Sequence, residues 1–108
     1  MAAPEHTPLL VIGAGPYGLA TAAEARRLGI PTVVLGEPMG FWRRDMPAAM
    51  LLRSGREWHL DAAGVHTLDA YAEERGLDPG AIDPIPIDVF IGYADWFAAQ
   101  KGIEARPE

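Results

Sequence analysis

The chain has 108 residues, 49% of them hydrophobic, a length that suits one globular domain but is too short for two cofactor-binding domains. Its formal net charge of -6 argues against binding to nucleic acid or to an anionic membrane, because both need a basic protein face. The absence of cysteine excludes a disulfide framework, a thiolate metal site and a redox-active cysteine pair within these residues.

Residues 1–8 are predicted to form a flexible tail. They are polar and have no basic segment, and the apolar run that follows them is only four residues long. Neither a signal peptide nor a membrane span fits this pattern, so we expect a soluble, cytoplasmic protein.

Residues 9–35 are predicted to form a βαβ unit. Leu9–Ile12 is a short continuous apolar run, typical of a strand buried on both faces. A glycine-rich turn leads into an alanine-rich helix from Pro16 to about Leu28, which Gly29 ends. The second strand, Thr32–Leu35, follows directly.

The rest of the chain has weaker signals. Residues 36–66 show little periodicity and are predicted to be a long excursion with little regular structure, a kind of segment that is often functional. Residues 67–101 form a helical region in which Thr67 caps a short helix ending at Gly76. Residues 77–86 contain three prolines and indicate a turn-rich connection.

A second helix is expected from an N-cap at Asp88 to about Lys101, with Gly102 as its stop. Its aromatic side chains have the spacing of a core-facing helix face rather than of a cofactor site. These are Phe90, Tyr93, Trp96 and Phe97. Residues 103–108 are consistent with the start of a third strand.

The turn between the first strand and the first helix carries the motif with chemical meaning, Gly-x-Gly-x-x-Gly. Gly13 permits a sharp exit from the strand, Gly15 lets the backbone approach a pyrophosphate, and Gly18 lets the helix pack close to the strand. The free N–H groups at the helix start then attract the phosphates. The motif alone also occurs in purely structural turns, but its position between a strand and a helix predicts dinucleotide binding.

An acidic residue at the end of the second strand is expected to bind the adenosine ribose. Here the usual position falls on Gly36, and Glu37 comes one residue later. Either Glu37 reaches the ribose from a shifted turn, or the backbone and water hold the ribose and Glu37 is an exposed turn carboxylate.

Several segments resemble a known family. Residues 11–20 with 40–43 resemble the FAD-binding start of flavin-containing monooxygenases and of lysine and ornithine N-hydroxylases. Residues 37–43, 46–47, 50–54, 85–87 and 93–97 are similar to a bacterial group of FAD/NAD(P)-binding oxidoreductases. The resemblance implies an α/β fold: a partial, Rossmann-like FAD-binding domain over residues 1–108, with a βαβ unit followed by a long loop and two helices.

The resemblance also implies a set of FAD contacts. The pyrophosphate would lie at the glycine turn, the ribose at residue 37, the middle of the cofactor at 41–43 and the flavin ring near 50–54, which makes 36–66 the cofactor-contacting loop region. The residues implied are Gly13, Gly15, Pro16, Tyr17, Gly18, Glu37, Phe41, Trp42, Arg43, Met50, Leu51, Arg53 and Ser54. For Trp42 and Met50, ordinary core packing is the alternative.

Other residues carry weaker signals. Four basic residues of the excursion favour a phosphate-bearing ligand or, alternatively, form a solvated face paired with Asp45 and Glu57; they are Arg43, Arg44, Arg53 and Arg56. Trp58, His59 and Asp61 lack the spacing of a catalytic group, and the histidines lack metal-ligand spacing. We therefore assign no catalytic residue and no metal site.

The resemblance implies a flavin-dependent, NAD(P)H-using monooxygenase or oxidoreductase, with NADPH bound by a part of the family architecture that these residues lack. We expect the chain to be a fragment, a truncated reading frame or one half of a split enzyme, inactive alone, with a complementary chain that completes the fold. The alternatives are an NAD-binding dehydrogenase fragment and a non-enzymatic subunit that docks on a partner.

Overall fold

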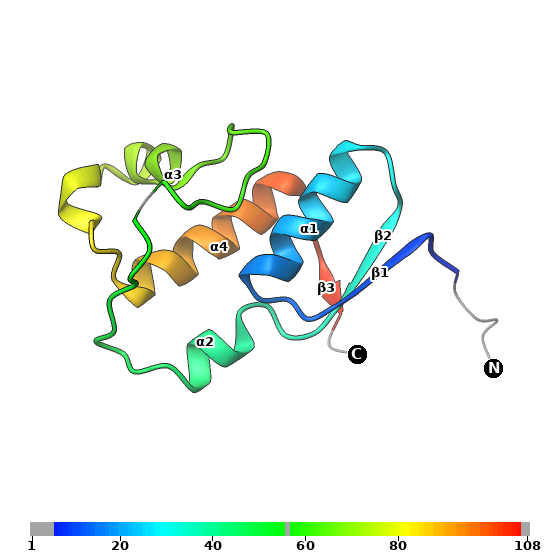
Figure 1. The fold of residues 1–108 in the computed structure, drawn as a ribbon, viewed down its shortest axis with the longest axis horizontal. Helices are drawn as coiled ribbons and strands as arrows, with labels where there is room; N and C mark the ends of the chain where they lie inside the picture. The colour runs from blue at the N-terminus through cyan, green and yellow to red at the C-terminus, as the bar shows by residue number, and fades with distance from the viewer. Residues whose placement is uncertain (1–5, 56, 107–108) are drawn as a thin grey trace.

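The structure is a computed structural model, and it describes residues 6–55 and 57–106. It begins with strand β1 (Leu9–Ile12), helix α1 (Pro16–Arg27) and strand β2 (Thr32–Leu35). The two strands pair in parallel, with Val11 opposite Val34, and α1 packs on one face of them (Figure 1). The predicted elements of the βαβ unit are confirmed.

The last part of the chain returns to this sheet. Helix α4 (Ile87–Lys101) packs beside α1 and ends at Gly102, and strand β3 (Ala105–Arg106) then pairs in parallel with β2. The order is β1-β2-β3, which confirms the expected third strand over two residues and the α/β class. Both ends of the described chain lie at the sheet end of the molecule (Figure 1).

Three shorter helices lie between β2 and α4: α2 (Gly40–Arg44), α3 (Leu68–Arg75) and the 3-10 helix η1 (Pro79–Ile82). The prediction for α3 is confirmed with its cap, since the Thr67 hydroxyl accepts a hydrogen bond from the Ala70 N–H at 3.1 Å. The excursion over 36–66 is more regular than predicted, because Met39 is fully buried and its carbonyl accepts from the Arg43 N–H, which starts α2.

The predicted N-cap of α4 was wrong. The helix begins at Ile87, and Pro86 is the cap, with an extended backbone and a carbonyl that accepts from the Phe90 N–H. Ile87 is buried, and this burial places Asp88 inside the first turn. There its carboxylate lies near the positive end of the helix dipole without capping it.

The hydrophobic core lies between α1, α4 and the inner face of the sheet. Phe90, Tyr93 and Phe97 of α4 are buried in it with Leu19 of α1 and Val34 of β2, which confirms the predicted core face of α4. In the described part of the chain, no helix is both long and apolar enough to cross a membrane.

The outer face of the sheet is open. Ile12 is 82% exposed and Leu10 48% exposed, whereas Val11 between them faces the core. The expectation that this strand is buried on both faces is therefore wrong within the described residues. A parallel sheet is normally covered on both faces, whereas the described residues leave this face exposed.

Candidate functional site

The glycine turn connects β1 to α1 in a conformation that side chains would obstruct. Gly13 has a φ of 113°, a region that favours glycine, and its N–H donates to the Leu35 carbonyl at 2.7 Å. A Cβ on Gly18 would overlap the Gly13 carbonyl oxygen and lie 3.0 Å from its carbonyl carbon. The third glycine therefore sets the close packing of helix on strand, as the motif predicts.

The start of α1 presents unpaired backbone N–H groups. Gly15 is the N-cap, no side chain caps the helix, and the first helical hydrogen bond runs from the Leu19 N–H to the Gly15 carbonyl. A Cβ on Gly15 would meet nothing within 4 Å, so the backbone is open to an approaching group. These N–H groups and the helix dipole favour an anion.

The turn after β2 packs directly against the glycine turn. Gly36 has a φ of 133°, and a Cβ on it would lie 3.1 Å from the Ala14 nitrogen. The Met39 N–H donates to the Ala14 carbonyl at 2.9 Å. These contacts bring α2 beside the start of α1.

The two turns and α2 surround an open pocket of about 310 Å³, which we call the glycine pocket. It is lined by Gly13, Ala14, Gly15, Gly36, Glu37, Gly40, Phe41, Trp42 and Arg44. Its glycine side is mainly backbone, and its α2 side carries aromatic and charged groups.

Glu37 lies on the α2 side of this pocket and forms an ion pair with Arg44. Both side chains are more than half exposed, so the pair is screened by solvent. The Glu37 carboxylate also lies over Gly40, where a Cβ would be 2.9 Å from Oε2. A ribose bound by Glu37 therefore competes with Arg44 for the same carboxylate.

A second pocket, of about 210 Å³, adjoins the first, and we call it the apolar pocket. It is lined by Pro16, Tyr17, Ala20, Trp42, Leu52, Ser54, Trp58, His59, Leu60 and Phe90. Trp42 lines both pockets, and its ring packs on that of Phe90 with the centroids 5.2 Å apart. The start of α1 thus lies between a backbone-lined pocket and an aromatic one.

Most of the residues implied by the resemblance lie at these two pockets. The glycine pocket has Gly13, Gly15, Glu37, Phe41 and Trp42, and the apolar pocket has Pro16, Tyr17, Ser54 and again Trp42. Gly18 lines neither pocket and packs against the Gly13 carbonyl. Arg43, Met50, Leu51 and Arg53 line neither of the two pockets.

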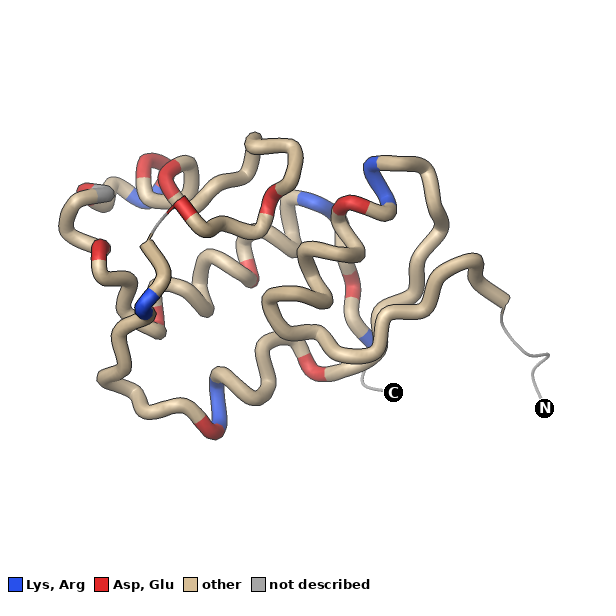
Figure 2. Tube along the Cα trace, viewed as in Figure 1, with Lys and Arg blue, Asp and Glu red and all other residues tan. Residues whose placement is uncertain are grey.

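Two basic residues of the excursion form exposed ion pairs, as the solvated-face alternative expects, but with other acidic partners than the two expected. Arg43 binds Asp95 of α4 and the Pro38 carbonyl, and Arg44 binds Glu37, so neither pairs with Asp45 or Glu57. Arg56 lies outside the described residues. Figure 2 shows basic positions spread among acidic ones instead of gathered in one patch.

Sequence reasoning missed several lining residues. The residues that complete the glycine pocket are Ala14, Gly36, Gly40 and Arg44, and those that complete the apolar one are Ala20, Trp58, His59, Leu60 and Phe90, whereas Leu52 lies within the predicted 50–54 segment. The position of Gly36 directly after the second strand was a usable signal. The others come from segments far apart in sequence, and only the tertiary packing brings them together.

The loop from 58 to 66 has a buried polar centre. Asp61 is 4% exposed, and its carboxylate accepts from the N–H groups of Ala63, Val65 and His66 and from the Lys101 ammonium at 2.8 Å. Burial raises the pKa of Asp61, but the hydrogen bonds from Lys101 and from the His66 and Ala63 amides outweigh it and hold the pKa well below its usual range.

Tyr93 provides the second attachment of this loop to α4. Its hydroxyl accepts from the Leu60 N–H at 3.0 Å and donates to the His66 carbonyl at 2.8 Å. Burial raises the pKa of Tyr93 to about 12. Lys101 and Tyr93 thus attach the loop to α4 at two points.

Comparison with known proteins gives a fold but no family. No protein-family model matches the sequence, and no curated protein matches it. Among solved structures, the chain is similar to the lysine monooxygenase NbtG from Nocardia farcinica, with a TM-score of 0.72 and 22% identity over 91% of this chain. It is also similar to the bacillithiol disulfide reductase Bdr (YpdA) from Staphylococcus aureus, with a TM-score of 0.67 and 18% identity over 93%.

The chain spans 34% of the length of NbtG and 28% of the length of Bdr. At these identities the likeness concerns the fold. The 108 residues contain no cysteine, so this stretch has no thiol of its own for disulfide exchange. The chain has the α/β fold of the matched third of two oxidoreductases.

Proposed function

We propose that this chain binds FAD, as the nucleotide-binding segment of a flavin-dependent monooxygenase or a related oxidoreductase that uses NAD(P)H. The observation that carries the proposal is the pair of adjoining pockets at the start of α1, one lined largely by the backbone of the glycine turn and the other by aromatic side chains. FAD has parts that suit both, a diphosphate and a flat, largely apolar ring system.

In this proposal the backbone supplies the diphosphate contacts. The N–H groups of Tyr17 and Gly18 donate to the phosphate oxygens, since Pro16 at the first helical position has none, and the glycine at position 13 helps to keep the turn narrow. Glu37 binds the ribose in place of its present partner Arg44. Phe41 and Trp42 flank the middle of the cofactor.

The apolar pocket receives the flavin ring. Trp42, Leu52 and Phe90 form its apolar walls, and Ser54 adds a hydroxyl. When bound, FAD supplies the redox chemistry, and the residues of the chain orient it and exclude water. We assign no general acid or base.

The proposal includes further protein that completes the sheet. Leu10 and Ile12 are exposed on its outer face, and the matched structures are about three times longer than this chain. The motif at 13–18 is the one Gly-x-Gly-x-x-Gly in the sequence, so a second nucleotide such as NADPH would bind elsewhere in such an assembly. The chain alone is then expected to bind FAD but not to turn over NADPH.

Titration of the purified chain with FAD and with NAD tests the proposal. We expect saturable binding of FAD and an at least roughly tenfold loss in Gly15→Ala, about 1.4 kcal/mol, because the new methyl group occupies the phosphate approach. Gly15 has a φ of -79° and open space at Cβ, so its thermal midpoint should not change. Gly80→Ala, in η1, is the matched control.

Other results would contradict the proposal. Saturable binding of NAD without FAD would favour the dehydrogenase alternative, and binding of neither would favour a non-enzymatic subunit. Rapid NADPH-dependent turnover by the chain with FAD would contradict the need for further protein.

A further inference from the structure

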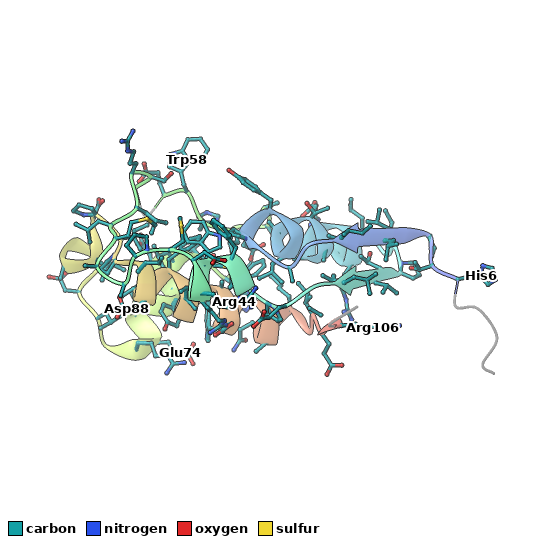
Figure 3. The ribbon with its side chains drawn as sticks, turned by 90° about the horizontal axis from the view of Figure 1, so that it is seen from below. His6, Arg44, Trp58, Glu74, Asp88 and Arg106 are labelled. Atoms are coloured by element: carbon teal, nitrogen blue, oxygen red, sulfur yellow. The ribbon has the colours of Figure 1, made fainter. Side chains whose placement is uncertain are left out.

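One wall of the apolar pocket comes from the loop that Asp61 organises. Trp58, His59 and Leu60 precede the buried carboxylate directly and line the pocket. Trp58 is 71% exposed and stands out from the surface of this loop (Figure 3). His59 is only partly exposed and lies between this rim residue and the buried Leu60.

The position of this wall is set from α4. The Leu60 N–H donates to the Tyr93 hydroxyl, and the Asp61 carboxylate accepts from Lys101. Tyr93 is fully buried and Lys101 is largely buried, so both attachments lie in the protein interior. His59 is therefore followed directly by two anchored residues, Leu60 and Asp61.

A hydrogen bond also selects the tautomer of the neutral His59 ring. The Asp61 N–H donates to His59 Nδ1 at 3.1 Å. A ring nitrogen that accepts a hydrogen bond carries no proton, so the proton of the neutral imidazole is on Nε2. His59 thus offers one N–H donor and no second acceptor.

We infer that His59 is a cofactor-orienting residue, whose Nε2–H donates a hydrogen bond to an edge oxygen or nitrogen of the ring bound in the apolar pocket. The inference rests on the proposed function, and it gives His59 a binding role but no catalytic one. Tyr17, another polar residue of the lining, is 89% exposed, so its hydroxyl is not held in the same way.

The test compares FAD with ADP, which shares the adenosine and a diphosphate but lacks the flavin ring. His59→Leu is expected to weaken FAD binding about three- to tenfold, the range for one neutral hydrogen bond, and to leave ADP binding unchanged. His59→Gln, whose amide can still donate, should retain part of the FAD affinity. The visible absorption bands of bound FAD should shift in His59→Leu and shift less in His59→Gln.

His66→Leu is the matched control, because His66 lies in the same loop and packs on Trp96 without lining the apolar pocket. It should leave both affinities unchanged. An equal loss of FAD and ADP binding in His59→Leu, no loss, or the same FAD-specific loss in His66→Leu would overturn the inference and leave the proposed function standing. Failure of the unaltered chain to bind either nucleotide would overturn both.

Discussion

Backbone N–H groups gather at two places in this protein, and their partners differ. At the start of α1, beside the open glycine pocket, they have no side-chain cap. In the loop after Asp61, three of them donate to a carboxylate that the chain itself supplies. The first group suits an external anion, and the second is satisfied within the fold.

The two groups of N–H donors therefore have different roles: those at α1 are available to a ligand, and those in the Asp61 loop stabilise the fold. The Asp61 carboxylate is buried and attached to two elements, so its loss would affect the folded state as a whole. The α1 N–H groups lie at a surface pocket, so a change there would affect a ligand first. The predictions below test this separation.

The largest effect is expected for Asp61→Ala. The substitution leaves three part-buried N–H groups and the largely buried Lys101 ammonium without their acceptor. We expect a loss of about 3–5 kcal/mol in the free energy of unfolding, measured by urea denaturation. Glu73→Ala, at an exposed position of α3, is the control. A loss below about 1 kcal/mol, the scale of an exposed ion pair, would remove the contrast between the two regions.

The Asp61 carboxylate also predicts that the stability of the folded protein falls at acid pH. Because the pKa of Asp61 is lowered in the folded state, the folded protein holds this group ionised where the unfolded chain begins to take up a proton. Its contribution to stability is present above the unfolded pKa of about 4 and is lost as the pH falls further. The slope of stability against pH below about pH 5 should therefore be smaller in Asp61→Ala.

An intermediate effect is expected for Gly18→Ala. The added Cβ overlaps the Gly13 carbonyl oxygen, so α1 must move away from β1 at a cost of about 1–3 kcal/mol. At Gly15 the added Cβ meets open space, so Gly15→Ala should weaken nucleotide binding without lowering the free energy of unfolding. Thermal denaturation of the two variants side by side measures the difference. Equal midpoints would show that the turn tolerates a side chain at Gly18.

The smallest effect is expected for Glu37→Gln. Its ion pair with Arg44 is exposed, so the free energy of unfolding should change by less than about 1 kcal/mol, and less at high salt. If the carboxylate binds the ribose, FAD affinity should fall about fivefold. Asp45→Asn, at the C-cap of α2, is the control. Unchanged FAD affinity would favour a ribose held by backbone and water.

Local signals predicted the elements well where each had a local physical cause. The strand at Leu9–Ile12 is a continuous apolar run, and α3 begins at a threonine that caps it and ends at a left-handed glycine. The predicted cap of α4 was wrong because the burial of Ile87, a tertiary effect, starts the helix two residues earlier. The helix α2 was missed for a similar reason, the burial of Met39.

The candidate site divides in the same way. Sequence reasoning identified the glycine turn because three glycines at this spacing, between a strand and a helix, are typical of a tight turn that binds a pyrophosphate. It did not identify the wall formed by His59 and Leu60, since that wall is positioned by Tyr93 and Lys101 more than thirty residues later. The cofactor roles of all the implied residues stay predictions, and Met50, Leu51, Arg43 and Arg53 line neither pocket.

The order of residues alone determined the βαβ unit and the anion-attracting start of α1, because both follow from backbone conformations that neighbouring residues permit or forbid. Only the folded chain decided which side chains surround the second pocket and which carboxylate fills the loop, because those contacts join segments that are distant in sequence. Adjacent residues determine local backbone conformation, whereas the burial of a side chain depends on how the whole molecule packs.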